Sequence, residues 1–157
     1  MGKQKNHASA RSPCTVNRKA LRDYELLERF EAGLVLTGSE VKSLRAAQAD
    51  LDGAYARIQD GECWLVGVKI AQYKQAGAAS HDPDRKRKCL LHKSQIRKIW
   101  SRLQQKGLTL VPLRLYFTQK GLAKAELALA RGKRQYDKRR SIIEKDQRRE
   151  MDRHRKG

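Results

Sequence analysis

The sequence predicts a mainly β protein: a small β-barrel with flanking helices, followed by a basic C-terminal tail that is disordered when free. Apolar and polar side chains alternate with a period of two in several segments between residues 24 and 130, as in half-buried strands. A glycine interrupts the first of these runs, and such breaks occur where a sheet bends into a barrel. After residue 131 the only large apolar side chains are Tyr136, Ile142, Ile143 and Met151, too few to bury a helix face.

The first predicted strand covers residues 24–36 and follows a polar segment, residues 1–16, that we expect to be a flexible lead. Gly33 interrupts the alternation and marks a bulge or a sharp bend. Thr37 and Glu40 then have the spacing of a capping box, in which each side chain hydrogen-bonds the backbone of the other residue. A helix is therefore expected to begin at this point.

A β-hairpin is predicted around the Asp-Gly dipeptide at residues 60–61. Alternating runs at residues 54–58 and 64–70 flank this dipeptide, which favours the tight turns of hairpins. Residues 71–84 contain glycine, serine and proline and are expected to form a loop.

Residues 92–106 are predicted to form an amphipathic helix that ends at Gly107. Its apolar stripe consists of residues at helical spacing: Ile96, Ile99, Trp100 and Leu103.

Two further strands are predicted at residues 108–118 and 122–130, and Pro112 is expected at an edge or a bulge because proline has no N–H to donate. We expect one set of side chains to face another across these strands: Leu113, Leu115 and Phe117 opposite Ala125, Leu127 and Leu129.

The charge indicates a polyanionic partner. The chain has 36 Lys and Arg against 17 Asp and Glu, a formal net charge of +19. Residues 85–106 hold nine basic residues and no acidic one, while residues 131–157 hold twelve basic and five acidic residues. Solubility requires a net charge of only ~2–8 in magnitude, so a merely soluble basic surface is the weaker interpretation. A barrel domain at residues 17–130 and a separate tail at residues 131–157 would each bind a phosphate backbone, at two different places.

The sequence carries little catalytic chemistry, so the protein is predicted not to be an enzyme. It has no phosphate-binding loop, zinc-protease motif or nucleophile elbow. The three cysteines are far apart and lack metal-ligand spacing, which argues against a zinc site or a disulfide scaffold and suits the cytoplasm: Cys14, Cys63 and Cys89. No apolar run is long enough to span a membrane. Neither a cofactor nor a metal is expected.

Nucleic-acid binding has stronger support. The four consecutive cations at residues 85–88 repel one another unless an anion is present. Tyr55 and Tyr73 could stack on bases, although covering the barrel surface is the more common role of a single tyrosine.

Several segments together resemble the SsrA-binding protein family (small protein B, SmpB). The longest is residues 30–45, Phe-Glu-Ala-Gly-Leu-Val-Leu-Thr-Gly-Ser-Glu-Val-Lys-Ser-Leu-Arg, which is too long to match by chance. The resemblance extends over roughly Val16–Arg155, through these shorter segments: 17–20, 54–58, 81–83, 87–88, 90–93, 106–113, 132–133 and 136–139.

This resemblance implies an oligonucleotide-binding-type barrel that holds the tRNA-like part of transfer-messenger RNA (tmRNA) and delivers it to stalled bacterial ribosomes for trans-translation. It implies action as a monomer on the RNA, with the tail folding in the decoding centre and the empty mRNA path of the small subunit. Matched by position, the expected RNA-binding residues are Asn17, Arg18, Lys19, Glu31, Arg85, Lys86, Arg87, Lys88, Leu91, His92 and Lys93. The expected decoding-centre residues are Gly132, Tyr136, Asp137, Lys138 and Arg139.

Two other function classes fit the composition. A ribosomal or ribosome-assembly protein could combine the same kind of barrel with a tail threaded into ribosomal RNA. A metal-dependent nuclease would need converging carboxylates, and Glu25, Glu28 and Glu31 are the only acidic group of that kind. In a strand Glu25 and Glu28 face opposite sides, which disfavours the nuclease.

Overall fold

A computed structural model of the chain describes residues 14–133, 147–151 and 153. The elements in chain order are β1 (Thr15–Val16), α1 (Arg18–Asp23), β2 (Tyr24–Leu34), α2 (Gly38–Arg45), β3 (Ala49–Asp50), β4 (Tyr55–Gln59), β5 (Glu62–Val66), β6 (Lys69–Ile70), the 3-10 helix η2 (Lys74–Ala79), β7 (Arg87–Leu90), α3 (Lys93–Leu103), β8 (Leu108–Phe117) and β9 (Ala123–Gly132).

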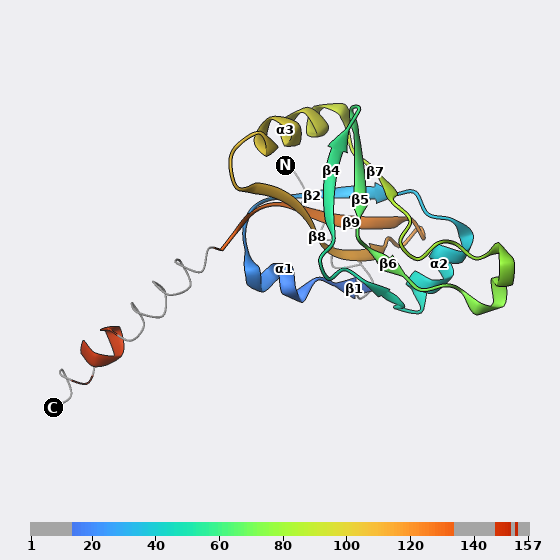
Figure 1. The fold of residues 1–157 in the computed structure, drawn as a ribbon, viewed down its shortest axis with the longest axis horizontal. Helices are drawn as coiled ribbons and strands as arrows, with labels where there is room; N and C mark the ends of the chain where they lie inside the picture. The colour runs from blue at the N-terminus through green and yellow to red at the C-terminus, as the bar shows by residue number, and fades with distance from the viewer. Residues whose placement is uncertain (1–13, 134–146, 152, 154–157) are drawn as a thin grey trace.

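The main sheet closes into a barrel, as the sequence predicted. Its seven strands have the order β1-β8-β4-β5-β7-β2-β9, and β8 also pairs with β9, so the barrel closes between β8 and β9 while the two-residue strand β1 lies beside β8. Closure removes the exposed strand edges that an open sheet would present. Strands β3 and β6 form a separate two-stranded sheet. Figure 1 shows α3 and α1 at opposite ends of the barrel, with the chain leaving β9 on the side of α1.

The long pair of β2 and β9 is irregular at Leu27 and not at Gly33, where the sequence analysis placed the break. The register shifts between Leu26 and Glu28. Gly33 is instead regularly paired, with Lys124 on one side and with Leu90 on the other. A Cβ added at Gly33 would lie 3.3 Å from the Cβ of Leu90, so the absence of a side chain lets β7 approach closely.

Both local motifs near the middle of the chain form as predicted. Thr37 caps α2, and the Glu40 carboxylate accepts a hydrogen bond from the Thr37 N–H at 2.9 Å. Asp60 and Gly61 both have positive φ angles, 52° and 73°, as a type I′ hairpin turn between β4 and β5 requires. The second run, however, does not continue to residue 70 as one strand. Strand β5 ends at Val66, and Gly67, with a φ of 81°, changes the direction of the chain toward β6.

A second bulge changes which side chains of β8 face the core. The register with β9 shifts between Pro112 and Arg114, as expected for a proline that cannot donate to the ladder. Leu115 and Phe117 point into the main core with Leu127, but Leu113 does not join them. The prediction for Leu113 was wrong because the extra residue at the bulge inverts the alternation. Leu113 instead packs in a smaller cluster beneath α1, together with these residues: Ala20, Val111, Ala128 and Ala130.

Helix α3 contacts the barrel through a narrower stripe than predicted. Ile99 is fully buried, while Trp100, expected in the same stripe, is 52% exposed. Consecutive residues on a helix point about 100° apart, so a helix that lies on the barrel at Ile99 turns Trp100 toward its flank. The helix ends at Leu103, and Gly107 then takes a φ of 83°.

The core is rich in leucine and alanine, and two of the cysteines belong to it. Cys63 and Cys89 face each other across β5 and β7, are buried, and are free thiols. A buried free cysteine of this kind packs as a small apolar side chain.

The barrel extends beyond both boundaries drawn from the sequence. Thr15–Val16, assigned to the flexible lead, forms β1 and pairs with β8 at Leu115 and Arg114. At the other end β9 continues to Gly132 because its last residues pair with the start of β2. Residues 147–151 are helical; they are helix formers without proline. Residues 134–146 lie outside the described residues.

Candidate nucleic-acid interface

Arg87 is the least accessible cation of the basic stretch at residues 85–88. Its side chain is 1% exposed, and its Nε lies 2.5 Å from a carboxylate oxygen of Glu40. The guanidinium also donates to the carbonyl oxygens of Val68 at 2.6 Å and Pro83 at 3.1 Å. These partners leave the Arg87 guanidinium without an accessible donor for a phosphate in this structure. RNA binding by Arg87 stays a prediction that its burial does not favour, because a stretch of four cations does not reveal which of them has an internal counter-ion.

Glu40 supplies that counter-ion to two arginines. Its carboxylate is fully buried and also accepts from Arg85 Nη2 at 2.5 Å. Burial by itself raises the pKa of Glu40, but hydrogen bonds from Arg85, the Thr37 backbone and Arg87 outweigh it and lower the pKa to about 2. The Glu40 carboxylate thus completes the cap of α2 and links this helix to Arg87 in β7 and to Arg85 in the loop that precedes β7. Arg85, whose side chain is 35% exposed, retains only a partly free guanidinium.

Outside this network, the segment leading into α3 presents accessible charge. Lys86, His92 and Lys93 are exposed. Lys88 is partly exposed and forms an ion pair with Glu62 at 3.0 Å, which solvent screens strongly. Leu91 is half-buried and packs against the core, so it can contribute an apolar contact while holding this segment in place.

Asn17 holds α1 in place and is not a surface residue. It is 2% exposed and accepts the Ala20 N–H at 3.0 Å as the cap of α1. Its Nδ2 donates to the carbonyl oxygens of Pro112 at 2.9 Å and Leu51 at 3.4 Å. An RNA contact by Asn17 stays a prediction that its burial does not favour, because its polar side-chain atoms already have partners. Arg18 and Lys19, the next two residues, are exposed as a contact with RNA requires.

Glu31 is exposed on the outer face of β2, within a charged cluster that sequence reasoning missed. The Tyr116 hydroxyl donates to its carboxylate at 2.5 Å, and Glu126 lies directly opposite on β9. Glu126 in turn binds Arg114 at 2.5 Å and Arg29 at 3.0 Å. Burial, and then the Glu31 carboxylate, raise the pKa of the Tyr116 hydroxyl, so it stays protonated and remains a donor.

The cluster contains two carboxylates, two guanidinium groups and a phenol, which come from the three adjacent strands β2, β9 and β8. The guanidinium of Arg114 also lies 4.8 Å from the centre of the Tyr116 ring. A face of this kind offers both donors and acceptors to the sugar edges and bases of RNA. The alternation of β8 could have placed Arg114 and Tyr116 on the outer face. Only the register of the strands reveals that they meet Glu31 and Glu126.

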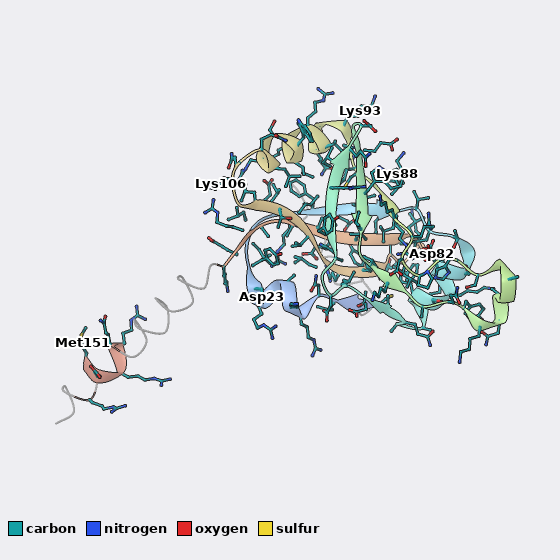
Figure 2. All side chains as sticks on the ribbon, in the orientation of Figure 1. Asp23, Asp82, Lys88, Lys93, Lys106 and Met151 are labelled. Atoms are coloured by element: carbon teal, nitrogen blue, oxygen red, sulfur yellow. The ribbon has the colours of Figure 1, made fainter. Side chains whose placement is uncertain are left out.

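The predicted decoding-centre residues begin where the barrel ends. Gly132 is exposed at the end of β9, and the Lys133 N–H donates to the carbonyl oxygen of Asp23 at 2.9 Å. Tyr136 and residues 137–139 lie outside the described residues. Figure 2 shows Asp23 beside the point where the chain leaves the barrel, and Lys88 and Lys93 at the opposite side of the barrel. Lys88 and Lys93 therefore lie away from the end of β9, whereas Lys106, in the same basic stretch, precedes Leu108, which pairs with Arg131 of β9.

Within the part of the chain that the structure describes, no group of His, Cys, Asp and Glu side chains could hold a metal ion. No helix in the same residues has the length and apolar character of a membrane span. The site thus consists of cations, aromatic rings and hydrogen-bonding groups on a closed barrel.

Comparison with known proteins identifies the family. The family model described as SmpB protein matches residues 14–157, which include the barrel and the tail. The chain belongs to the SmpB family.

Relatives named SsrA-binding protein are similar along nearly the whole chain. The one from Sulfurihydrogenibium sp. (strain YO3AOP1) is 53% identical over 141 residues, which cover 90% of this chain and 92% of the relative. The one from Thermus thermophilus is 53% identical over 129 residues, which cover 82% of this chain and 90% of the relative.

A solved SmpB chain has the same fold. It comes from a structure described as "tmRNA-SmpB: a journey to the center of the bacterial ribosome", is 49% identical, and superposes with a TM-score of 0.68 over 83% of this chain and 95% of that chain.

Proposed function

We propose that this SmpB-family protein binds the tRNA-like domain of tmRNA and delivers it to stalled ribosomes for trans-translation, in which the ribosome is rescued and its unfinished peptide is tagged. The observation that carries the proposal is the match over residues 14–157, which includes both the barrel and the basic tail. The relatives named SsrA-binding protein and the solved tmRNA–SmpB structure support the same partners, tmRNA and the ribosome.

The barrel provides the proposed tmRNA contacts. After the internal partners of Arg87 and Asn17 are taken into account, the accessible residues of the predicted set are Arg18, Lys19, Glu31, Lys86, His92 and Lys93, with Arg85, Lys88 and Leu91 partly accessible. The cations would neutralise phosphates, which supplies affinity and a dependence on salt. The cluster around Glu31 would contact base and sugar edges, which supplies selectivity.

The tail is proposed to act on the small ribosomal subunit. Gly132 would be the point at which the chain turns away from the barrel. Tyr136 would stack on a decoding nucleotide, and residues 137–139 would contact ribosomal RNA while the rest follows the empty mRNA path. Net positive charge supports this role, since residues 131–157 hold twelve basic residues.

No chemical step is assigned to the protein itself. We propose that it is a non-enzymatic binding factor without a cofactor, that it acts as a monomer on the RNA, and that it works in the cytoplasm, where its proposed partners are.

Mobility-shift titration of the full chain and of a chain ending at residue 133 tests the division between barrel and tail. The cut leaves β9 and the hydrogen bond between Lys133 and Asp23 intact. Both proteins are expected to bind tmRNA equally well, and more tightly than ordinary tRNA or ribosomal RNA fragments. Unselective binding, or binding that disappears with the tail, would instead favour a ribosomal or ribosome-assembly protein.

A further inference from the structure

Two of the three cysteines lie directly opposite each other in the barrel. Cys63 of β5 and Cys89 of β7 are partners in an antiparallel pair of strands. Their side chains belong to the main core, are 0% and 2% exposed, and are free thiols. Directly opposite residues of antiparallel strands have Cα atoms about 4.5–5.5 Å apart, and a disulfide requires about 4.4–6.8 Å. The pairing of β5 with β7 therefore gives the two cysteines the backbone spacing that a disulfide needs.

The two thiols also differ in how readily each loses its proton. A hydrogen bond with the Cys89 thiol lowers the pKa of Cys63, although burial opposes this effect. The same hydrogen bond and burial both raise the pKa of Cys89. When one proton leaves the pair, the Cys89 S–H donates to the Cys63 thiolate. Because the thiolate is the nucleophile, Cys63 is the sulfur that attacks first, and Cys89 is the second sulfur beside it.

Cys14 provides an internal comparison on another part of the barrel. Its backbone N–H donates to the carbonyl oxygen of Leu115 in β8 at 2.9 Å, so it lies beside a strand that neither member of the pair belongs to. Cys14 is half-buried, and burial raises its pKa while the charge of Arg45 opposes this. This thiol is thus more accessible than the pair but less nucleophilic at neutral pH.

Burial of the pair determines which oxidants can react with it. A bulky disulfide such as oxidised glutathione cannot approach sulfur atoms inside the core. A peroxide is small and uncharged, and it can enter when β7 opens locally. Strand β7 has only four residues, three of which pair with β5. The residue after Cys89, Leu90, is 54% exposed, so this strand lies at the surface of the domain.

We propose that Cys63 and Cys89 form an oxidation site at which a small peroxide converts the two thiols into an intramolecular disulfide that links β5 to β7. The Cys63 sulfur attacks one peroxide oxygen, the O–O bond breaks, and the other oxygen leaves as water after taking up a proton. The Cys89 sulfur then attacks the sulfenic acid on Cys63, the S–O bond breaks, and a second water leaves with the Cys89 proton. Two thiols lose two electrons in total, and one hydrogen peroxide is reduced to two waters. The site does not depend on the proposed function.

The disulfide is expected to stabilise the barrel. It would close the loop of residues 64–88, which contains β6, η2 and the two arginines that bind Glu40. A cross-link of this kind restricts the unfolded chain and so favours the folded one. Both sulfur atoms belong to the core, so the bond changes none of the exposed cations near β7. The oxidised protein should therefore bind tmRNA as the reduced protein does.

Peptide mapping detects the bond directly. The full chain is treated with hydrogen peroxide, alkylated in denaturant, digested with trypsin and analysed by mass spectrometry. We expect residues 58–69 joined to residues 89–93, with a mass two hydrogen atoms below the sum of the reduced peptides, and loss of the link with dithiothreitol. Cys14→Ser is the matched control and should retain the link, whereas Cys63→Ala and Cys89→Ala should lack it. Oxidised glutathione should produce the link far more slowly than peroxide.

Thermal melting gives the second measurement. The melting temperature of the oxidised protein should exceed that of the reduced protein by about 3–10 °C, in the wild type and in Cys14→Ser. Cys63→Ala should show no such difference. Each variant is compared with its own reduced form, so any loss of stability caused by the substitution itself does not affect the result. Affinity for tmRNA should stay within about twofold on oxidation.

The outcomes distinguish the oxidation site from the proposed function. Peroxide that modifies Cys14 and leaves Cys63 and Cys89 as thiols, or that joins Cys14 to either of them, would overturn the site. A lower melting temperature, or a clear loss of tmRNA affinity in the cross-linked protein, would overturn its stabilising role. A wild type that forms the cross-link but does not bind tmRNA selectively would support the site and refute the proposed function.

Discussion

Glu40→Gln tests whether the buried arginines belong to the fold or to an RNA interface. Glutamine can still accept the Thr37 N–H through its Oε1 and complete the capping box, but its NH2 group replaces the oxygen that accepts from Arg87 Nε, so the substitution removes the charge and that acceptor. It leaves Arg85 and Arg87 beside a neutral group, and Arg87 has no access to water. Breaking a buried pair from one side costs ~3–5 kcal/mol.

The lowered pKa of Glu40 gives a similar estimate of the loss in the free energy of unfolding. A carboxyl group lowered from 4.5 to about 2 contributes about 3 kcal/mol at neutral pH, since each pKa unit is worth about 1.4 kcal/mol. Because the folded pKa is the lower one, this contribution is complete above pH 4.5 and is lost as the pH falls toward 2. The difference between wild type and Glu40→Gln should therefore be about 3 kcal/mol at pH 6 and shrink steadily below pH 4.5.

Urea unfolding monitored by circular dichroism measures both effects. Glu62→Gln is the matched control: it breaks the Lys88–Glu62 pair, whose side chains are 38% and 44% exposed, and should cost no more than about 1 kcal/mol. If Glu40→Gln is as mild as Glu62→Gln, the network does not hold the fold together. Arg85 and Arg87 would then be free to bind RNA.

Three further predictions follow from the assignments above. Alanine at Lys86 or Lys93 should weaken tmRNA binding and reduce the slope of log K against log salt by roughly one unit for each phosphate that is no longer neutralised; an unchanged slope would mean that the side chain touches no phosphate. Asn17→Ala should lower the free energy of unfolding by about 1–3 kcal/mol, because it removes the cap of α1 and two buried hydrogen bonds, while the folded protein keeps its selectivity for tmRNA in a competition titration. Alanine at residues 137–139 should leave tmRNA affinity nearly intact and abolish peptide tagging in a reconstituted translation reaction; loss of tmRNA binding in that variant would contradict the separation of barrel and tail.

Local motifs were predictable wherever neighbouring residues determine the outcome. The capping box of Thr37 and Glu40 and the turn at Asp60 and Gly61 formed as expected, because each depends on interactions within three or four residues. One error lies where an extra residue shifts a strand. Leu113 was assigned to the wrong cluster because the bulge beside Pro112 inverts the side-chain alternation from that point.

The residues of the candidate site also fall into two groups, those that the sequence could predict and those that only the folded structure could reveal. Accessible cations such as Lys86 and Lys93 could be predicted from charge alone, since a dense basic stretch leaves most of its members in solvent. Arg87 could not be separated from them, because its partner Glu40 is 47 residues away and meets it only in the folded barrel.

The sequence by itself determined the class of the fold, the net charge and the family, because these depend on composition, periodicity and a long continuous motif. The tertiary structure alone decided which polar groups face each other. It placed Asn17 and Arg87 inside the domain, gathered Glu31, Glu126 and Arg114 on one face, and set Cys63 opposite Cys89 in the core. The physical reason is that charge and hydrogen-bonding capacity belong to a residue, whereas their availability depends on every group that the closed barrel brings within a few ångströms.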